Sequence, residues 1–188
     1  CFDEDPSPAF LRFAGSYPNT PSALLSRIVD TCSDAEVLAR VAGHHRAPRD
    51  VLLSLAHHAS LTVRLAVGSN TLATPQALDT LAGDPAWPVR EAVAANRQLP
   101  ARLQEQFVSD VGCVKAALLR QKHLAAGVWE RLVASDDVWS FAVLVEAACK
   151  KEQLLELADT DHLFIQQHLL TRRNLPEDVL ESLCFSPH

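Results

Sequence analysis

The chain contains no methionine, few aromatic residues and no long apolar run. Aromatic residues make up 6% of its 188 residues, and no stretch of 18 apolar residues occurs, so no membrane-spanning helix is expected. Because an initiator residue is missing, we expect a processed or trimmed chain. Hydrophobic residues nevertheless make up 48% and charged residues 21%, which is enough to build the core of one domain.

The five cysteines lack the spacing of two common kinds of site. They form no CxxC pair and lie far apart, which favours neither a zinc site nor a compact disulfide framework. We therefore expect reduced, mostly buried thiols, as in a cytoplasmic protein. The alternative is a lipid-anchored envelope protein of bacterial type, with Cys1 as the lipid-bearing residue. The cysteines are Cys1, Cys32, Cys113, Cys149 and Cys184.

Signatures of catalysis and of general nucleic-acid binding are also missing. The sequence has no glycine-rich phosphate loop, no GxSxG elbow and no HExxH motif, so we predict no enzymatic activity, no catalytic residue and no cofactor. The formal net charge of -6 gives no global attraction to phosphate. Binding to nucleic acid would therefore need a local basic stripe.

A repeat of 25 or 26 residues runs through the chain. Val63-Arg64 returns as Val89-Arg90, and Asn70 returns as Asn96. One column of apolar residues marks the later part of each unit: Val29, Leu55, Leu81, Phe107, Leu132, Leu157 and Leu183. Counting back places the unit starts near Leu11, Val37, Val63, Val89, Val114, Trp139 and Ile165. A fixed period of this length is typical of a solenoid, in which each unit packs on its neighbours.

Each unit should hold two short helices. Apolar residues at the first, fourth and fifth positions predict the first helix, and a polar residue such as Asn70 then predicts a turn. A proline such as Pro75 suits the first position of the second helix. Twenty-five residues are too few for two long helices, so we predict an all-α solenoid of about seven α/α or α/3-10 units. It forms one domain over residues 10–188, after a polar lead-in or cap at 1–9.

The repeated pattern resembles a known family. The pattern Val-Arg-x-x-Val-Ala-x-Asn, then Pro, then Leu-x-x-Leu-Ala-x-Asp resembles the leucine-rich repeat variant family, most strongly over residues 63–110. The spacing from Asp84 to Arg90 is also similar to that of HEAT repeats. The resemblance implies a right-handed solenoid of short alternating α and 3-10 helices. The family includes an iron-sulfur protein whose cluster is held by a cysteine-rich N-terminal segment, which this sequence lacks, so no cluster is implied.

A column of basic residues follows the unit starts. Its members are Arg12, Arg64, Arg90 and Lys115. Stacked units place equal columns side by side, so these residues could form a ladder for a phosphate backbone. Alternatively each cation pairs with a nearby carboxylate and holds the units together, Asp84 with Arg90 and Asp110 with Lys115. The acidic chain and the interruptions of the column favour the structural role; the interruptions are Leu38, Ser140 and Gln166.

Histidine pairs and repeated asparagines are further candidates for binding. His44-His45 and His57-His58 have the chemistry of zinc or copper ligands, but they fall toward opposite edges of a helical unit, so we predict no metal site. The amides of Asn70 and Asn96, with Gln121 in the same column and His44 in its counterpart, could bind a peptide backbone. We favour the alternative, in which each closes its own turn.

Trp87 is a separate candidate for a contact with a partner. It lies in the segment between Asp84 and Pro88, outside the core columns, and exposed tryptophans often anchor interfaces. Alternatively it packs over the seam between two units. Trp129 and Trp139 occupy apolar columns and should be core.

We therefore predict a non-enzymatic scaffold or binding module for a protein or peptide partner, with no membrane span and with a further domain or cap beyond either end. The predicted partner-binding residues are Arg64, Trp87, Arg90 and Lys115. The alternative is a nucleic-acid-binding, DNA-repair-like protein that uses the basic column. A glycosylase-type enzyme would need an acid beside an exposed aromatic, for which Asp84 and Trp87 are the nearest pair.

Overall fold

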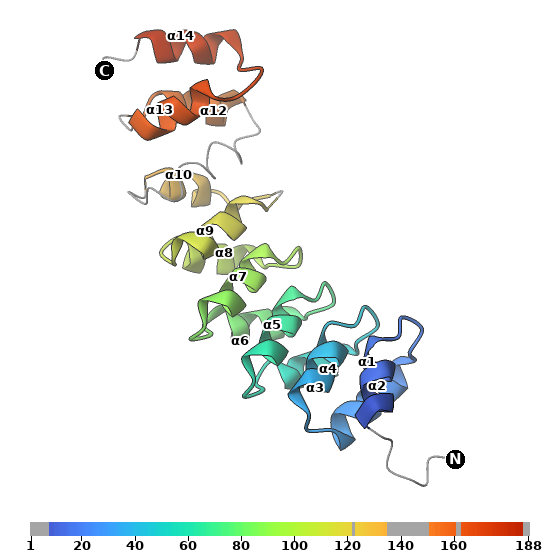
Figure 1. The fold of residues 1–188 in the computed structure, drawn as a ribbon. Coiled ribbons are helices and arrows are strands. Elements are labelled where there is room, and N and C mark those ends of the chain that lie inside the picture. Colours follow the sequence, from blue (N-terminus) through green and yellow to red (C-terminus); the bar gives the residue numbers. More distant parts are fainter. Residues whose placement is uncertain (1–7, 122, 135–150, 161–162, 186–188) are drawn as a thin grey trace.

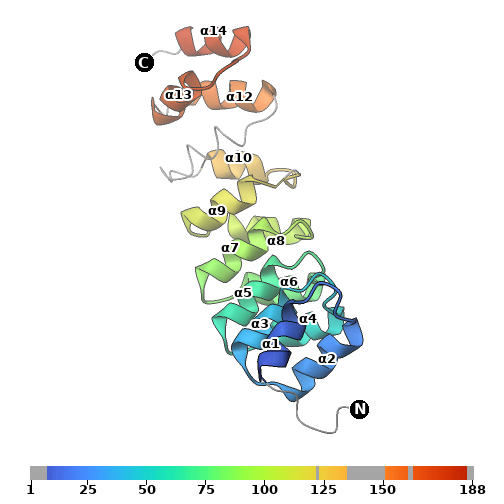
Figure 2. The same cartoon turned by 45° about the vertical axis from the view of Figure 1, so that its right-hand side comes forward.

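The fold is an elongated stack of short helices. The computed structural model describes residues 8–121, 123–134, 151–160 and 163–185. Within these ranges it is all-α, with 13 helices and no strand. The helices follow one another from α1 to α14 in sequence order, as two views of the ribbon show (Figures 1 and 2). The prediction of an all-α helical-repeat solenoid is confirmed.

Each unit consists of a first and a second helix joined by a turn. The first helices are α1 (Pro8–Ser16), α3 (Ala35–Ala42), α5 (Leu61–Ser69), α7 (Trp87–Ala95), α9 (Gly112–Leu119) and α13 (Leu163–Leu170). The second helices are α2 (Ser22–Thr31), α4 (Arg49–Leu55), α6 (Pro75–Ala82), α8 (Ala101–Phe107), α10 (Val128–Val133), α12 (Lys151–Ala158) and α14 (Glu177–Phe185). All are α-helices, so in the described part of the chain the units are α/α and show no 3-10 helix.

The prolines lie at the starts of the second helices, as predicted, but most of them stand just before the first helical residue rather than at it. Pro75 is the first residue of α6, behind Thr74, whose hydroxyl accepts from Ala77 N–H at 3.2 Å. Pro48 and Pro100 are instead the caps of α4 and α8, with extended ψ angles of 143° and 139°. A residue with extended ψ stands outside the helix, so in these units the helix begins after the proline.

The predicted apolar columns form a continuous core. The unit starts from Leu11 to Val114, and Ile165, are buried, whereas Trp139 lies outside the described residues. In the later column, only Val29 and Leu183 are half-buried, in the first and the last unit. Trp129 is buried as predicted, and its Nε1–H donates to Glu156 Oε2 at 2.9 Å.

Small residues let neighbouring first helices approach closely. A Cβ added at Gly68 would lie 3.3 Å from Val93 Cγ2 and 3.4 Å from Ala92 Cβ of the next unit. The equivalent positions 26 residues away hold Ala42 and Ala94, which are fully buried. These small residues therefore allow α3, α5 and α7 to pack closely against one another.

The solenoid thus has two different edges. The turns within units lie along one edge, which we call the turn edge, and the connections between units lie along the opposite edge, which we call the connection edge (Figure 1). Each edge carries its own set of polar contacts between units.

Candidate functional site

Buried asparagines join successive turns on the turn edge. Asn96 Nδ2 donates to the main-chain oxygens of Gly68 at 2.7 Å and Asn70 at 2.9 Å, both in the preceding unit. Its Oδ1 accepts from Gln98 N–H at 2.8 Å, which closes its own turn. Asn70 repeats this pattern with the unit before it and with Leu72 N–H. The turn-closing role is confirmed, and the bonds between units, which sequence reasoning missed, occupy the side-chain amides of both asparagines, so neither amide is available to a peptide.

Two other residue types extend this ladder. Gln121 Nε2 donates to Ala94 O at 2.6 Å and Asn96 O at 3.0 Å. His44 is buried, with its Nδ1 accepting from Arg46 N–H at 3.0 Å and its Nε2 at 2.9 Å from Tyr17 O. Because Nδ1 accepts, Nε2 carries the proton and donates to Tyr17 O. His44 thus replaces an asparagine. We call His44, Asn70, Asn96 and Gln121 the amide ladder.

The structure separates the two histidine pairs. His44-His45 lie in a turn within a unit, whereas His57-His58 lie in a connection between units. His58 Nδ1 accepts from Ser60 N–H at 3.0 Å, which closes the connection before α5. Among the described residues, no group of three or more potential ligands is placed to hold a metal ion.

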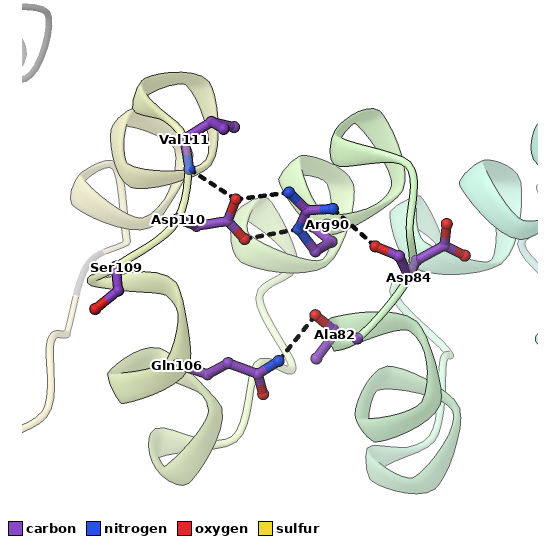
Figure 3. A pocket seen from close by; sticks show the side chains of 8 residues that line it. Ala82, Asp84, Arg90, Gln106, Ser109, Asp110 and Val111 are labelled. Atoms are coloured by element: carbon purple, nitrogen blue, oxygen red, sulfur yellow. Dashed lines mark hydrogen bonds and ion pairs between the residues drawn. The ribbon is translucent and has the colours of Figure 1, made fainter.

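Arginine–aspartate pairs on the connection edge tie the first helix of a unit to the connection that leads into the next unit. Arg90 donates from Nε to Asp110 Oδ2 at 2.7 Å and from Nη2 to Oδ1 at 2.8 Å. Its Nη1 donates to the main-chain oxygen of Asp84 at 2.7 Å (Figure 3). The same Nη1 also donates to the main-chain oxygen of Pro85 at 3.2 Å. Arg64 binds Asp84 in the same way, with Nε–Oδ2 at 2.6 Å and Nη2–Oδ1 at 3.2 Å. We call Arg64–Asp84 and Arg90–Asp110 the braces.

The braces differ from the pairing that the sequence suggested. The carboxylate of Asp84 binds Arg64, 20 residues earlier, and Arg90 reaches only the main-chain oxygen of Asp84. Arg64 and Arg90 are each the fourth residue of their helix. From this position Nη1 donates to the main-chain oxygens just before the helix, and Nε and Nη2 donate to the aspartate of the following connection. Lys115 is buried at 8% exposure and makes a polar interaction of its own. The side chain of Arg12 lies outside the described part of the structure.

The braces hold both carboxylates in the ionised form. Burial alone would raise the pKa of Asp84, but hydrogen bonds from Arg64 and Ala86 N–H, with the charges of Arg64 and Arg90, bring it below its ordinary value. Burial opposes ionisation of Asp110 in the same way, and the contacts with Arg90 and Val111 N–H lower its pKa. The same bonds raise the pKa of both arginines.

These lowered pKa values predict acid sensitivity. A carboxylate with a depressed pKa in the folded state contributes stability above its unfolded pKa, about 3.9 for aspartate, and loses it as the pH falls through the folded value. We therefore expect the free energy of unfolding, measured by urea titration, to drop below about pH 4. In an Asp84→Asn, Asp110→Asn variant this drop should be smaller. An equal drop in variant and wild type would contradict the assignment.

An open hollow of about 570 Å³ lies beside the second brace (Figure 3). Its charged side chains and Gln106 are already occupied, because Arg90 binds Asp110, Arg64 binds Asp84, and Gln106 Nε2 donates to Ala82 O at 3.1 Å. The hollow therefore offers no free acid and base in proximity. The lining residues are Ala82, Gly83, Asp84, Arg90, Gln106, Ser109, Asp110 and Val111.

Trp87 stands exposed at the connection edge. It is the first residue of α7 and is 46% exposed. Leu61, the first residue of α5, is 41% exposed, and Val111, the residue before α9, is 46% exposed. We call Leu61, Trp87 and Val111 the apolar stripe. Only Trp87 was predicted, although the 26-residue spacing from Leu61 could have indicated the second member.

The structure also bears on the acid of the glycosylase alternative and on the burial of the cysteines. The carboxylate of Asp84, the acid of the glycosylase alternative, is held by Arg64 and by Ala86 N–H and its side chain is 4% exposed. The expectation of mostly buried thiols is wrong for Cys113 and Cys184, which are exposed, and Cys32 is half-buried. Cys1 and Cys149 lie outside the described residues.

Comparison with known proteins assigns no family. No family model, curated protein or solved structure that we compared with the chain matches it. No helix in the described ranges is long and apolar enough to cross a membrane.

Proposed function

We propose that the chain is a non-enzymatic helical-repeat scaffold that recognises a protein or peptide partner through its connection edge. The observation that carries the proposal is the apolar stripe, in which Leu61, Trp87 and Val111 stand exposed on successive units. Aromatic side chains flanked by smaller apolar ones are typical of the energetic centre of protein interfaces. The resemblance to leucine-rich repeat variant and HEAT proteins supports a binding role, and we propose that the protein is cytoplasmic.

The braces give the stripe a fixed geometry. Arg90 holds the main-chain oxygens of Asp84 and Pro85, the residues that lead into Trp87. A side chain that is already positioned loses less entropy when a partner binds, which raises affinity. In this proposal Arg64 and Arg90 act by positioning the stripe, and Trp87 makes the contact.

The alternative, nucleic-acid binding through the basic column, receives less support. The guanidinium groups of Arg64 and Arg90 each bind a carboxylate in bidentate fashion, and Lys115 is buried. A phosphate would have to displace those carboxylates. The acidic partners also cancel the positive field that would attract a polyanion.

A pull-down with matched variants tests the proposal. We compare proteins retained by wild type, by Trp87→Ser and by Leu53→Ser, a control that removes a leucine 38% exposed on α4. Partners of the stripe should be retained by wild type and Leu53→Ser, and their affinity for Trp87→Ser should fall about 30-fold, as expected for an interface hot spot of about 2 kcal/mol. If all three chains retain the same proteins, or none, the stripe is not the binding site.

A further inference from the structure

The turn edge carries arginines without partners. Arg46, Arg97 and Arg120 are exposed, and among the described residues their guanidinium groups form no ion pair or hydrogen bond. The turns that contain them, together with the turn of the intervening unit, include no Asp or Glu: residues 43–48, 70–74, 96–100 and 120–127. Elsewhere in the described residues, arginines do pair with carboxylates, among them Arg40, Arg64, Arg90, Arg102 and Arg131.

The amide ladder makes these turns one continuous surface. Asn70 bonds the main chain at His44, Asn96 bonds it at Asn70, and Gln121 bonds it at Asn96. Arg46, Arg97 and Arg120 lie within two residues of members of this ladder, in the second, fourth and fifth units. With about 10 Å between packed helices, the three cations span roughly 30 Å. Because the ladder fixes the turns, this charge pattern is built into the fold.

The chemistry of this edge differs from that of the connection edge. No large hydrophobic side chain is exposed in the described residues of these four turns. Protein interfaces normally include an apolar centre, whereas a phosphate backbone needs mainly cations and hydrogen-bond donors. The exposed cations in the described residues of these turns are arginines, whose planar group suits phosphate oxygens. No Trp, Tyr or Phe lies in these four turns to stack on the bases of a single strand, which favours duplex; an exposed aromatic residue, Tyr17, lies outside them, in the turn of the first unit.

We infer that the turn edge binds the phosphate backbone of a nucleic-acid duplex, without sequence preference, through Arg46, Arg97 and Arg120. Acidic residues at the starts of the second helices, Asp50 and Glu130, lie next to these turns and limit the affinity. A duplex presents phosphates at regular, close spacing. The three arginines can therefore each meet a phosphate although the third unit between Arg46 and Arg97 contributes none. The inference does not depend on the proposed protein partner, which would bind the opposite edge.

Fluorescence anisotropy with a labelled duplex of about 20 base pairs, at about 50 mM salt, tests the inference. The Arg46→Gln, Arg97→Gln, Arg120→Gln variant should bind at least about tenfold more weakly than wild type. The slope of log K against log salt should shrink by roughly 2.7, since each phosphate contact contributes about 0.9. The control variant, Arg40→Gln, Arg102→Gln, Arg131→Gln, has the same net charge but loses only paired arginines, and it should bind within about twofold of wild type.

Three results would overturn the inference. Wild type could fail to bind duplex at micromolar concentration, or the two triple variants could lose affinity equally, which would indicate a net-charge effect. A poly-glutamate peptide of equal charge could compete better than duplex, which would identify an acidic protein segment as the ligand. Trp87→Ser should retain duplex affinity, so failure at one edge is distinguishable from failure at the other.

Discussion

Replacing Asn96 with alanine should lower the free energy of unfolding by about 3 kcal/mol, because a buried polar group left without its partner costs about 1–3 kcal/mol. The change removes the bonds that Asn96 makes with the main-chain oxygens of Gly68 and Asn70 and with the main-chain N–H of Gln98. All three bonds lie at or near one junction between units, so the loss weakens the coupling on which a solenoid depends. Urea denaturation followed by circular dichroism measures the effect.

Two variants serve as controls for Asn96. Gln98→Ala removes an exposed side chain from the same turn and should change stability by less than about 0.5 kcal/mol. Asn96→His should be less destabilising than Asn96→Ala, because His44 fills the equivalent position with both ring nitrogens bonded. If Asn96→Ala were as stable as wild type, the ladder would not hold the units together.

Replacing Asp84 with alanine should have a similarly large effect, with a loss of about 3 kcal/mol. The side chain of Asp84 is 4% exposed and that of Arg64 16%, so the change leaves a largely buried guanidinium facing a gap. Removing one member of a buried pair is more costly than replacing both members. The measurement is the urea midpoint at neutral pH, where Asp84 is ionised.

The equivalent positions of another unit indicate a double variant that should restore the stability lost in Asp84→Ala. The positions equivalent to Arg64 and Asp84 in the preceding units hold Leu38, which is buried, and His58. An Arg64→Leu, Asp84→His double variant copies that pair and should recover at least about half of the lost stability. If the double variant were less stable than Asp84→Ala alone, the two residues would not act as one brace.

The sequence predicts the period and the core because apolar side chains recur at fixed positions. Val63 and Val89 are fully buried as expected, since each faces a neighbouring unit with the same pattern. Of the contacts in the amide ladder, the sequence predicted only those within a turn. The turn closed by Asn96 Oδ1 is local, but the bonds of Nδ2 reach main-chain oxygens 26 and 28 residues away, which no side-chain pattern marks.

The arginines show a second limit of periodicity. Arg64 and Arg90 attract notice because they repeat, yet a repeated cation has a repeated partner: Asp84 and Asp110 each stand 20 residues later. The constant spacing of 20 was present in the sequence and could have predicted the braces. Arg46, Arg97 and Arg120 follow no fixed spacing, so a search for columns passes over them. Only the turns, stacked by the ladder, bring them onto one edge.

The account separates arginines that hold the fold from arginines that face outward, and one comparison tests this separation directly. Urea denaturation is measured for Arg64→Gln, Arg90→Gln and for Arg46→Gln, Arg97→Gln, which have the same net charge. The first variant should lose roughly 4 kcal/mol, because the buried carboxylate of Asp84 and the largely buried carboxylate of Asp110 lose their partners, and the second should stay within about 0.5 kcal/mol of wild type. Equal losses in the two variants would contradict the account.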